Sequence, residues 1–99
     1  MRRVVWSQAA LDDMRDQLHY IAVEDPDAAG RVVSALREAG NALADFATGH
    51  PGRVAGTYEK SVRGLPYIIA YAISDDDSSL SILRVIHSAR DWQPYGWPE

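Results

Sequence analysis

The sequence predicts a small α+β domain in which a helical hairpin packs on one face of a small antiparallel sheet, in the order β-α-α-β-β-β. Apolar residues recur at helical spacing in two runs of the first half, which "EDPD" (24–27) separates. The second half instead holds three short runs with β-tendency, bounded by turn residues. With 99 residues the chain has the size of one domain, so we treat residues 1–99 as a single unit.

The first strand and first helix are expected within residues 2–22. "RRVVW" (2–6) is a short β-run whose arginines suit the edge of a sheet. Ser7 follows as a helix N-cap, since its side-chain oxygen can accept an early backbone N–H. One helical face is then marked by apolar residues three and four positions apart: Leu11, Met14, Leu18 and Ile21.

The second helix is expected to start at Asp25, a good N-cap, with Pro26 in its first turn. Its apolar stripe continues to Phe46 and includes Gly40, where a glycine would let the two helices approach closely. Because the break between the helices is very short, they should fold back as an antiparallel hairpin.

Three strands are expected after a breaker-rich loop at 48–56. "YIIAYAI" is nearly all apolar, which indicates a central strand, and "SDDDSS" after it is a polar hairpin connection. The tail from Asp91 holds two prolines and a glycine before its end, so regular structure should stop there. The expected strands are "TYEKSVR" (57–63), "YIIAYAI" (67–73) and "LSILRVIH" (80–87).

Composition excludes several classes of protein. The chain has no cysteine, which rules out disulfides, thiolate zinc sites and a thiol nucleophile and agrees with a reducing cytosol. No apolar run reaches the roughly 20 residues of a membrane span, and the start does not fit a signal peptide. The net charge of −4 argues against general nucleic-acid binding, although residues 52–74 are locally basic while the helical half is acidic.

"ILRVIHSARDW" (82–92) holds the densest candidate chemistry, with His87, Arg90 and Asp91 close together. An imidazole can move protons near neutral pH and a guanidinium can hold a phosphate, two roles that suit RNA cleavage. The same residues equally fit a strand end in which His87 and Arg90 contact a partner or satisfy local charges.

For the other candidate residues, the sequence pattern favours structural roles. Lys60 and Arg63 are three apart and should face opposite sides of a regular strand, so scattered surface charge is the default for the basic residues. Tyr67 and Tyr71 share one face of the central strand and are expected in the core. The histidines lack ligand spacing, and no phosphate loop or nucleophile elbow is present, so we expect no metal and no cofactor.

Four stretches together resemble ParE-type toxins of the RelE/ParE superfamily, the toxin half of bacterial type II toxin–antitoxin modules. They cover most of the chain from Trp6 to Trp92, and their order and spacing are more specific than any one of them. The stretches are "WSQAALDDMRDQLHYIAVEDPDAAGRVV", "HPGRVAGTYE", "GLPYIIAYAI" and "ILRVIHSARDW".

The resemblance implies a helical hairpin on a small antiparallel sheet, in agreement with the periodicities. It also implies a cognate ParD-like antitoxin, commonly a ribbon-helix-helix protein, so that DNA is contacted only through the antitoxin and the pair forms a hetero-oligomer. In this superfamily ParE-like members poison DNA gyrase by binding, whereas RelE-like members cut mRNA in the ribosome with several basic residues.

The sequence favours the ParE-like function. Its pI near 5.2 and single lysine suit ribosomal RNA poorly, because that target is a dense polyanion. We therefore expect a cytoplasmic, growth-inhibiting gyrase inhibitor, of the kind that stabilises plasmids, without enzymatic activity of its own. The alternatives are a RelE-like ribosome-dependent mRNA endoribonuclease and a decayed, non-toxic module that only binds its antitoxin.

The resemblance also assigns site residues. Arg53 and Arg90 match the family pattern, whereas Tyr58 stands after "GT" where relatives commonly have arginine. In the nuclease alternative His87 would be the acid or base, with Arg63 and Arg90 on the phosphate. The residues expected to bind the target are Arg53, Tyr58, Lys60, Arg63, His87, Arg90 and Trp92.

Overall fold

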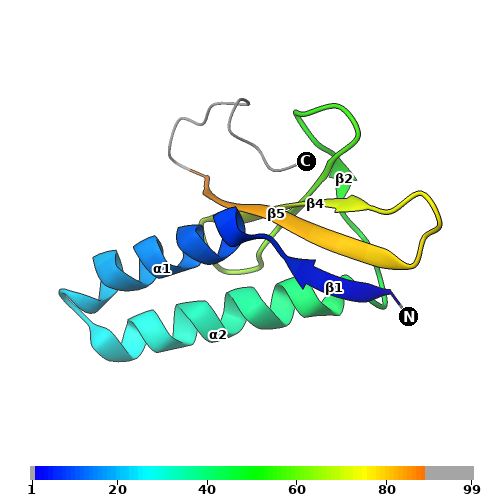
Figure 1. Ribbon diagram of the computed structural model, residues 1–99. Coiled ribbons are helices and arrows are strands. Elements are labelled where there is room, and N and C mark those ends of the chain that lie inside the picture. Colours follow the sequence, from blue (N-terminus) through cyan, green and yellow to red (C-terminus); the bar gives the residue numbers. More distant parts are fainter. Residues whose placement is uncertain (1, 89–99) are drawn as a thin grey trace.

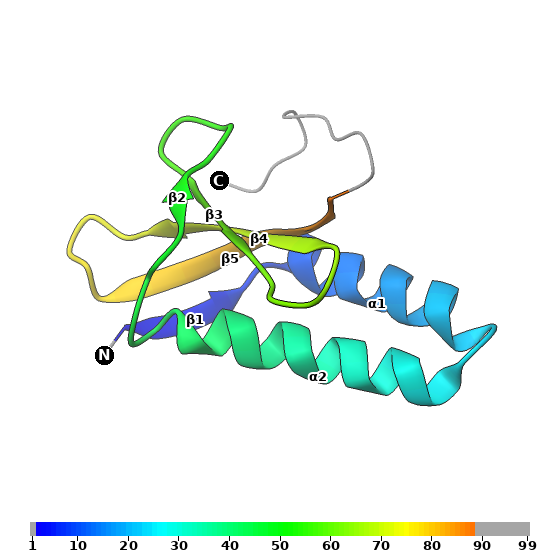
Figure 2. The same cartoon turned by 180° about the vertical axis from the view of Figure 1, so that it is seen from behind.

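Five strands form one sheet, and a pair of helices lies against one of its faces (Figures 1 and 2). The computed structural model describes residues 2–88. The strand order is β1-β5-β4-β3-β2, which places β4 in the middle as expected. The elements are β1 (Arg3–Trp6), α1 (Gln8–Ala22), α2 (Pro26–Ala42), β2 (His50–Pro51), β3 (Tyr58–Ser61), β4 (Tyr67–Ile73) and β5 (Ser79–His87).

The sheet is antiparallel except at its first edge, where β1 runs parallel to β5. A parallel pair needs a long connection, and the helical hairpin followed by the other strands supplies it. The sheet also gains a strand that the sequence did not predict, because β2 lies within the expected loop. The predicted α+β fold, with its helical hairpin on one sheet face, is otherwise confirmed.

Both helices begin where their capping residues predicted. Ser7 Oγ accepts from the Ala10 backbone N–H at 3.0 Å, and Asp25 Oδ1 accepts from the Ala28 N–H at 3.0 Å. Pro26 is the first residue of α2. The short link between the helices turns the chain back on itself, so the antiparallel hairpin is confirmed (Figure 1).

The buried face of α1 differs from the predicted stripe. Met14 is buried as expected, but Ala10 and Gln17 share that face with it. Leu11 and Leu18 are exposed, at 42% and 37%. Hydrophobic spacing predicts leucines at this contact, whereas the sheet accepts a small alanine and a hydrogen-bonded glutamine there. Two leucines of α1 are consequently left at the surface.

The end of α2 also differs. The helix stops at Ala42, and Phe46, expected on its buried stripe, is 75% exposed. Gly40 is buried against Trp6 of β1, since a Cβ at this position would lie 2.5 Å from the ring atom Cζ2. This glycine therefore lets α2 approach β1 closely. The expectation that it would let the two helices approach each other is wrong. The Trp6 indole N–H donates to Asn41 Oδ1 at 3.2 Å.

The core lies between the helices and the covered face of the sheet. Tyr67 and Tyr71 are 4% and 0% exposed, so their predicted core positions are confirmed. None of the helices within residues 2–88 has the length and apolarity needed to cross a bilayer. The buried cluster comprises Ala10, Met14, Leu36, Leu43, Val62, Tyr67, Ile69, Tyr71, Leu80, Ile82 and Val85.

Candidate functional site

A two-pronged ion pair joins Arg53 to Glu59 on β3. Arg53 Nε donates to Glu59 Oε2 at 2.8 Å and Nη2 donates to Oε1 at 3.0 Å. The Arg53 backbone N–H adds a third bond to Oε2 at 2.9 Å. The loop folds back onto β3 because Gly56 adopts φ 80° and the Gly52 N–H donates to the Thr57 carbonyl at 2.8 Å.

The Arg53 guanidinium neutralises a buried carboxylate. Glu59 is 3% exposed, and burial alone would raise the pKa of its carboxyl. The backbone and guanidinium hydrogen bonds from Arg53, with the nearby positive charge, instead lower that pKa below 4.5. A phosphate could take this guanidinium only by leaving the Glu59 carboxylate buried without its charge partner.

A second arginine is paired in a similar way. Arg84 of β5 donates from Nε and Nη2 to the two carboxylate oxygens of Asp13, both at 2.8 Å. Asp13 also accepts the Val85 backbone N–H at 2.9 Å, so it ties α1 to the edge of β5 beyond the end of β1. Its hydrogen bonds raise the pKa of the Arg84 guanidinium. In the sheet register Glu59 and Arg84 both stand opposite Ala70, so the two ion-paired residues lie on either side of the middle of β4.

His87 and Arg63 lie at one end of the sheet. His87 stands opposite Tyr67, and its ring meets the Tyr67 ring edge-on with centroids 5.3 Å apart. The Val62 N–H donates to the Tyr67 carbonyl at 2.9 Å, which brings the β3–β4 turn beside the same residue. Arg63 is exposed in that turn, where Gly64 adopts φ 78°. An imidazole and a guanidinium therefore reach the same sheet end.

The side chains of Tyr58 and Lys60 leave β3 on one face, and the side chain of Glu59 leaves it on the other. In the register Tyr58 faces Tyr71 and Lys60 faces Ile69, both of which belong to the core. The two tyrosine rings stack with centroids 5.6 Å apart. The Tyr71 hydroxyl accepts the Gly49 N–H at 2.9 Å, and burial raises its pKa. The Tyr58 ring thus packs on Tyr71, while 37% of the residue remains exposed.

The residues expected to bind the target consequently do not share one cleft. Arg53 lies over one sheet face, Tyr58 and Lys60 start from the other, and Arg63 and His87 occupy an end. Arg90 and Trp92 lie outside the described residues, so their assignments stay predictions. Across residues 2–88 no three histidine or acidic side chains are grouped so that they could hold a metal ion.

Three polar residues that pair with Arg53, Arg84 and Tyr67 were not predicted from the sequence. Glu59 could have been found, because alternation along "YEKS" places it on the face away from Tyr58. Asp13 offered no such signal, since its contact with β5 depends on how α1 crosses the sheet. Gln17 was hidden by its polarity, although it accepts a hydrogen bond from the Tyr67 hydroxyl at 2.9 Å in a buried position.

A helical hairpin against one face of a mostly antiparallel sheet is also the fold of solved toxin–antitoxin proteins. A chain of the structure titled "Chromosomal ParDE TA system from P. aeruginosa" matches with a TM-score of 0.80 at 21% identity, over 88% of this chain and 96% of that one. A chain of the toxin–antitoxin complex RelBE2 from Mycobacterium tuberculosis matches with a TM-score of 0.60 at 25% identity, over 87% and 96%.

Sequence comparison defines the family. The profile described as "ParE toxin of type II toxin-antitoxin system, parDE" matches residues 4–92. The chain therefore belongs to the ParE toxin family. It is similar to the putative toxin Y4kP of Sinorhizobium fredii, at 41% identity over 92% of this chain and 93% of that protein. It is also similar to the toxin RelE2 of Caulobacter vibrioides, at 35% identity over 91% and 99%.

Proposed function

We propose that this chain is a growth-inhibiting toxin that binds and poisons DNA gyrase, without a chemical step of its own, until a cognate antitoxin neutralises it in the cytoplasm. The observation that carries the proposal is the double pairing at mid-sheet. Arg53 and Arg84 each give their guanidinium to a carboxylate, so neither charge is available as a phosphate clamp without breaking that pair. The net charge of −4 also suits a protein target better than ribosomal RNA.

The antitoxin half of the proposal rests on family membership and on surface chemistry. Leu11 and Leu18 leave apolar surface along α1, and a partner segment would bury it. The similar solved chains come from ParDE and RelBE systems, which are toxin–antitoxin assemblies. We infer that the partner is ParD-like, with a ribbon-helix-helix half that contacts DNA.

Induced expression tests the target. The chain should arrest growth when expressed alone and should not when the product of the neighbouring reading frame is expressed with it. Chromosomal DNA breaks should accumulate while transcripts stay intact. Arg63→Ala should weaken the arrest, because this exposed arginine stands at the sheet end, whereas Arg31→Ala on the exposed side of α2 removes the same charge and serves as the control. Transcript cleavage without DNA breaks would refute gyrase as the target.

A second candidate, an mRNA endoribonuclease, is favoured by one observation. His87 and Arg63 come to the same sheet end, where an acid or base and a phosphate contact could cooperate, and the relative from Caulobacter vibrioides is named RelE2. In this case His87→Ala should abolish mRNA cleavage while antitoxin binding persists. Full growth inhibition by His87→Ala would exclude that mechanism.

The third alternative is a non-toxic module that keeps only the antitoxin interface. Tyr58 motivates it, since a tyrosine that stacks on Tyr71 occupies the place where the family resemblance implies an arginine. Such a module would bind the neighbouring gene product with no growth arrest on induction. Growth arrest of any strength, with the antitoxin absent, rejects it.

A further inference from the structure

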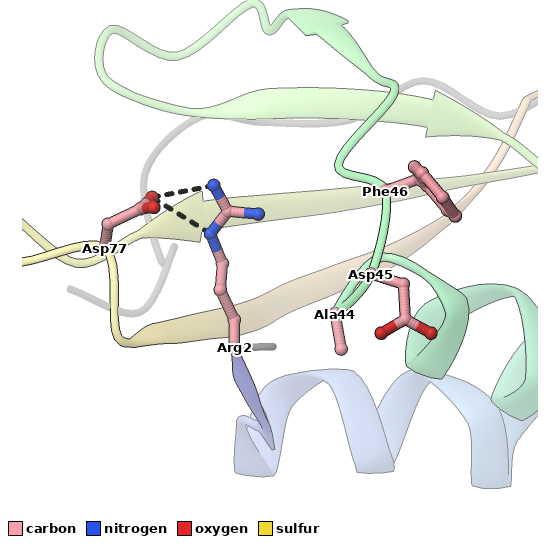
Figure 3. Close-up of a pocket in the computed structure, with 5 residues that line it drawn as sticks. All are labelled: Arg2, Ala44, Asp45, Phe46 and Asp77. Atoms are coloured by element: carbon pink, nitrogen blue, oxygen red, sulfur yellow. Dashed lines mark hydrogen bonds and ion pairs between the residues drawn. The ribbon is translucent and has the colours of Figure 1, made fainter.

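A pocket opens at the hairpin end of β4 and β5, where the segment after α2 meets the start of β1 (Figure 3). Its volume is about 450 Å³. It lies at the opposite end of these strands from the Tyr67–His87 pair, so the residues proposed to contact the target do not account for it. The lining residues are Arg2, Ala44, Asp45, Phe46 and Asp77.

Hydrogen bonds from three separate segments build this pocket. The Arg2 backbone N–H donates to the Ala44 carbonyl at 3.3 Å, which joins the start of β1 to the segment after α2. Arg2 Nε and Nη2 both donate to Asp77 Oδ1, at 3.0 and 2.7 Å, which joins β1 to the hairpin. Asp77 adopts φ 63° and its N–H closes the turn onto the Ser74 carbonyl at 2.9 Å. The pocket is therefore preorganised.

Phe46 presents an exposed ring on a fixed backbone. It is 75% exposed, yet its N–H donates to the Ala42 carbonyl at 3.2 Å and its carbonyl accepts the Thr48 N–H at 2.9 Å. An aromatic residue left in water forgoes the stabilisation that burial would give. Aromatic side chains are typical anchors of protein interfaces, and a backbone that is already fixed reduces the conformational freedom lost on binding.

The charge around this ring is negative. Arg2 already gives its guanidinium to Asp77, whereas the Asp45 carboxylate has no hydrogen bond or ion pair with any residue between 2 and 88. Figure 3 shows Asp45 and Phe46 next to each other on the same segment. The net negative charge of this lining disfavours phosphate, and therefore nucleic acid and anionic lipid headgroups. It suits a cationic side chain, for which the Phe46 ring offers cation–π packing and the Asp45 carboxylate offers an opposite charge.

We propose that this pocket takes an arginine or lysine side chain of the cognate antitoxin. The inference rests on the proposed function, which supplies a protein partner that must hold the chain tightly. The pocket adds an anchor far from the Arg63 and His87 end of the sheet. An antitoxin anchored in this pocket can hold the chain even if the antitoxin does not cover the Arg63 and His87 end of the sheet.

Binding of the antitoxin to pocket variants tests the inference. The chain would be titrated with the purified product of the neighbouring reading frame, by calorimetry at two salt concentrations. Phe46→Ala should weaken binding by about 10-fold or more, as loss of an aromatic anchor does. Asp45→Asn should weaken it about 3- to 10-fold and reduce the salt dependence. Asp75→Asn is the matched control, because it removes the same charge from the exposed hairpin tip without lining the pocket.

Both pocket side chains are exposed, so the variants should fold like the wild type, and thermal unfolding checks this. An Asp45→Arg variant should bind poorly and regain affinity when one antitoxin arginine or lysine is changed to aspartate. If the wild type binds but Phe46→Ala and Asp45→Asn bind equally well, the pocket inference is wrong and the proposed function stands. If these variants lose growth arrest and keep antitoxin affinity, the pocket belongs to the target and the inference is again overturned. If the wild-type chain itself does not bind, the proposed antitoxin is refuted and the pocket inference falls with it.

Discussion

Replacing Arg53 with alanine should destabilise the fold, because the change strips a buried carboxylate of its charge partner. The variant loses the bonds of 2.8 and 3.0 Å from the guanidinium and keeps only the backbone bond of 2.9 Å to Glu59. Breaking a fully buried pair costs about 3–5 kcal/mol. The Arg53 side chain is 33% exposed, so solvent screening reduces the expected loss to about 2 kcal/mol.

A loss of that size lowers the melting temperature of a domain this small by about 10 °C. Urea unfolding followed by circular dichroism measures the free energy, and thermal unfolding measures the temperature. Arg63→Ala is the control, because this exposed arginine stands in a turn and its loss should leave both values within about 0.5 kcal/mol of the wild type. If Arg53→Ala unfolds like the wild type yet no longer inhibits growth, Arg53 is a target contact and the reasoning from the ion pair is refuted.

Further stability measurements should separate other contacts. Gly40→Ala should destabilise by about 1–3 kcal/mol, because the added Cβ meets an indole at 2.5 Å, whereas Gly30→Ala, with nothing within 4 Å, should stabilise by about 0.5–1 kcal/mol. Equal effects in urea unfolding would contradict this. Tyr67→Phe should cost about 1–2 kcal/mol by leaving the buried Gln17 amide without its donor, and an unchanged free energy would exclude that hydrogen bond. The folded-state pKa of Glu59 is lowered, so its charge stabilises the fold above pH 4.5 and that contribution is lost as the pH falls through the lowered value. Glu59→Gln should therefore flatten the acid side of the stability profile, and an unchanged slope would reject the assignment.

Local signals predicted much of the fold. Ser7 and Asp25 cap the helices as their side chains indicated, and the apolar run of β4 lies in the middle of the sheet. The predictions that were wrong concern contacts between segments that are distant in the sequence. Phe46 looked like the next position of a helical stripe, but the helix had already ended. Gly40 was assigned to helix packing because nothing in the sequence says that Trp6 lies over it.

The candidate site was predicted less completely than the fold. Sequence pattern marked the arginines, but it could not show which of them a carboxylate already holds. Glu59 is six residues from Arg53, and Asp13 is 71 residues from Arg84, so the first pair needed the loop geometry and the second needed the packing of α1 on β5. The sheet-end position of His87 followed from the strand prediction, whereas Arg63 joined it only through the turn between β3 and β4.

Gyrase supercoiling in the presence of the purified chain tests the central claim most directly. Relaxed plasmid, gyrase and ATP would be incubated with increasing amounts of the chain, with and without the product of the neighbouring reading frame. We predict loss of supercoiling with trapped cleaved DNA, and relief of both by the neighbouring product. Trapping by His87→Ala should be weakened but not abolished, because this residue is expected to contact the target without a chemical role. Unchanged supercoiling at saturating chain, together with cleavage of ribosome-bound mRNA that depends on His87, would contradict the account.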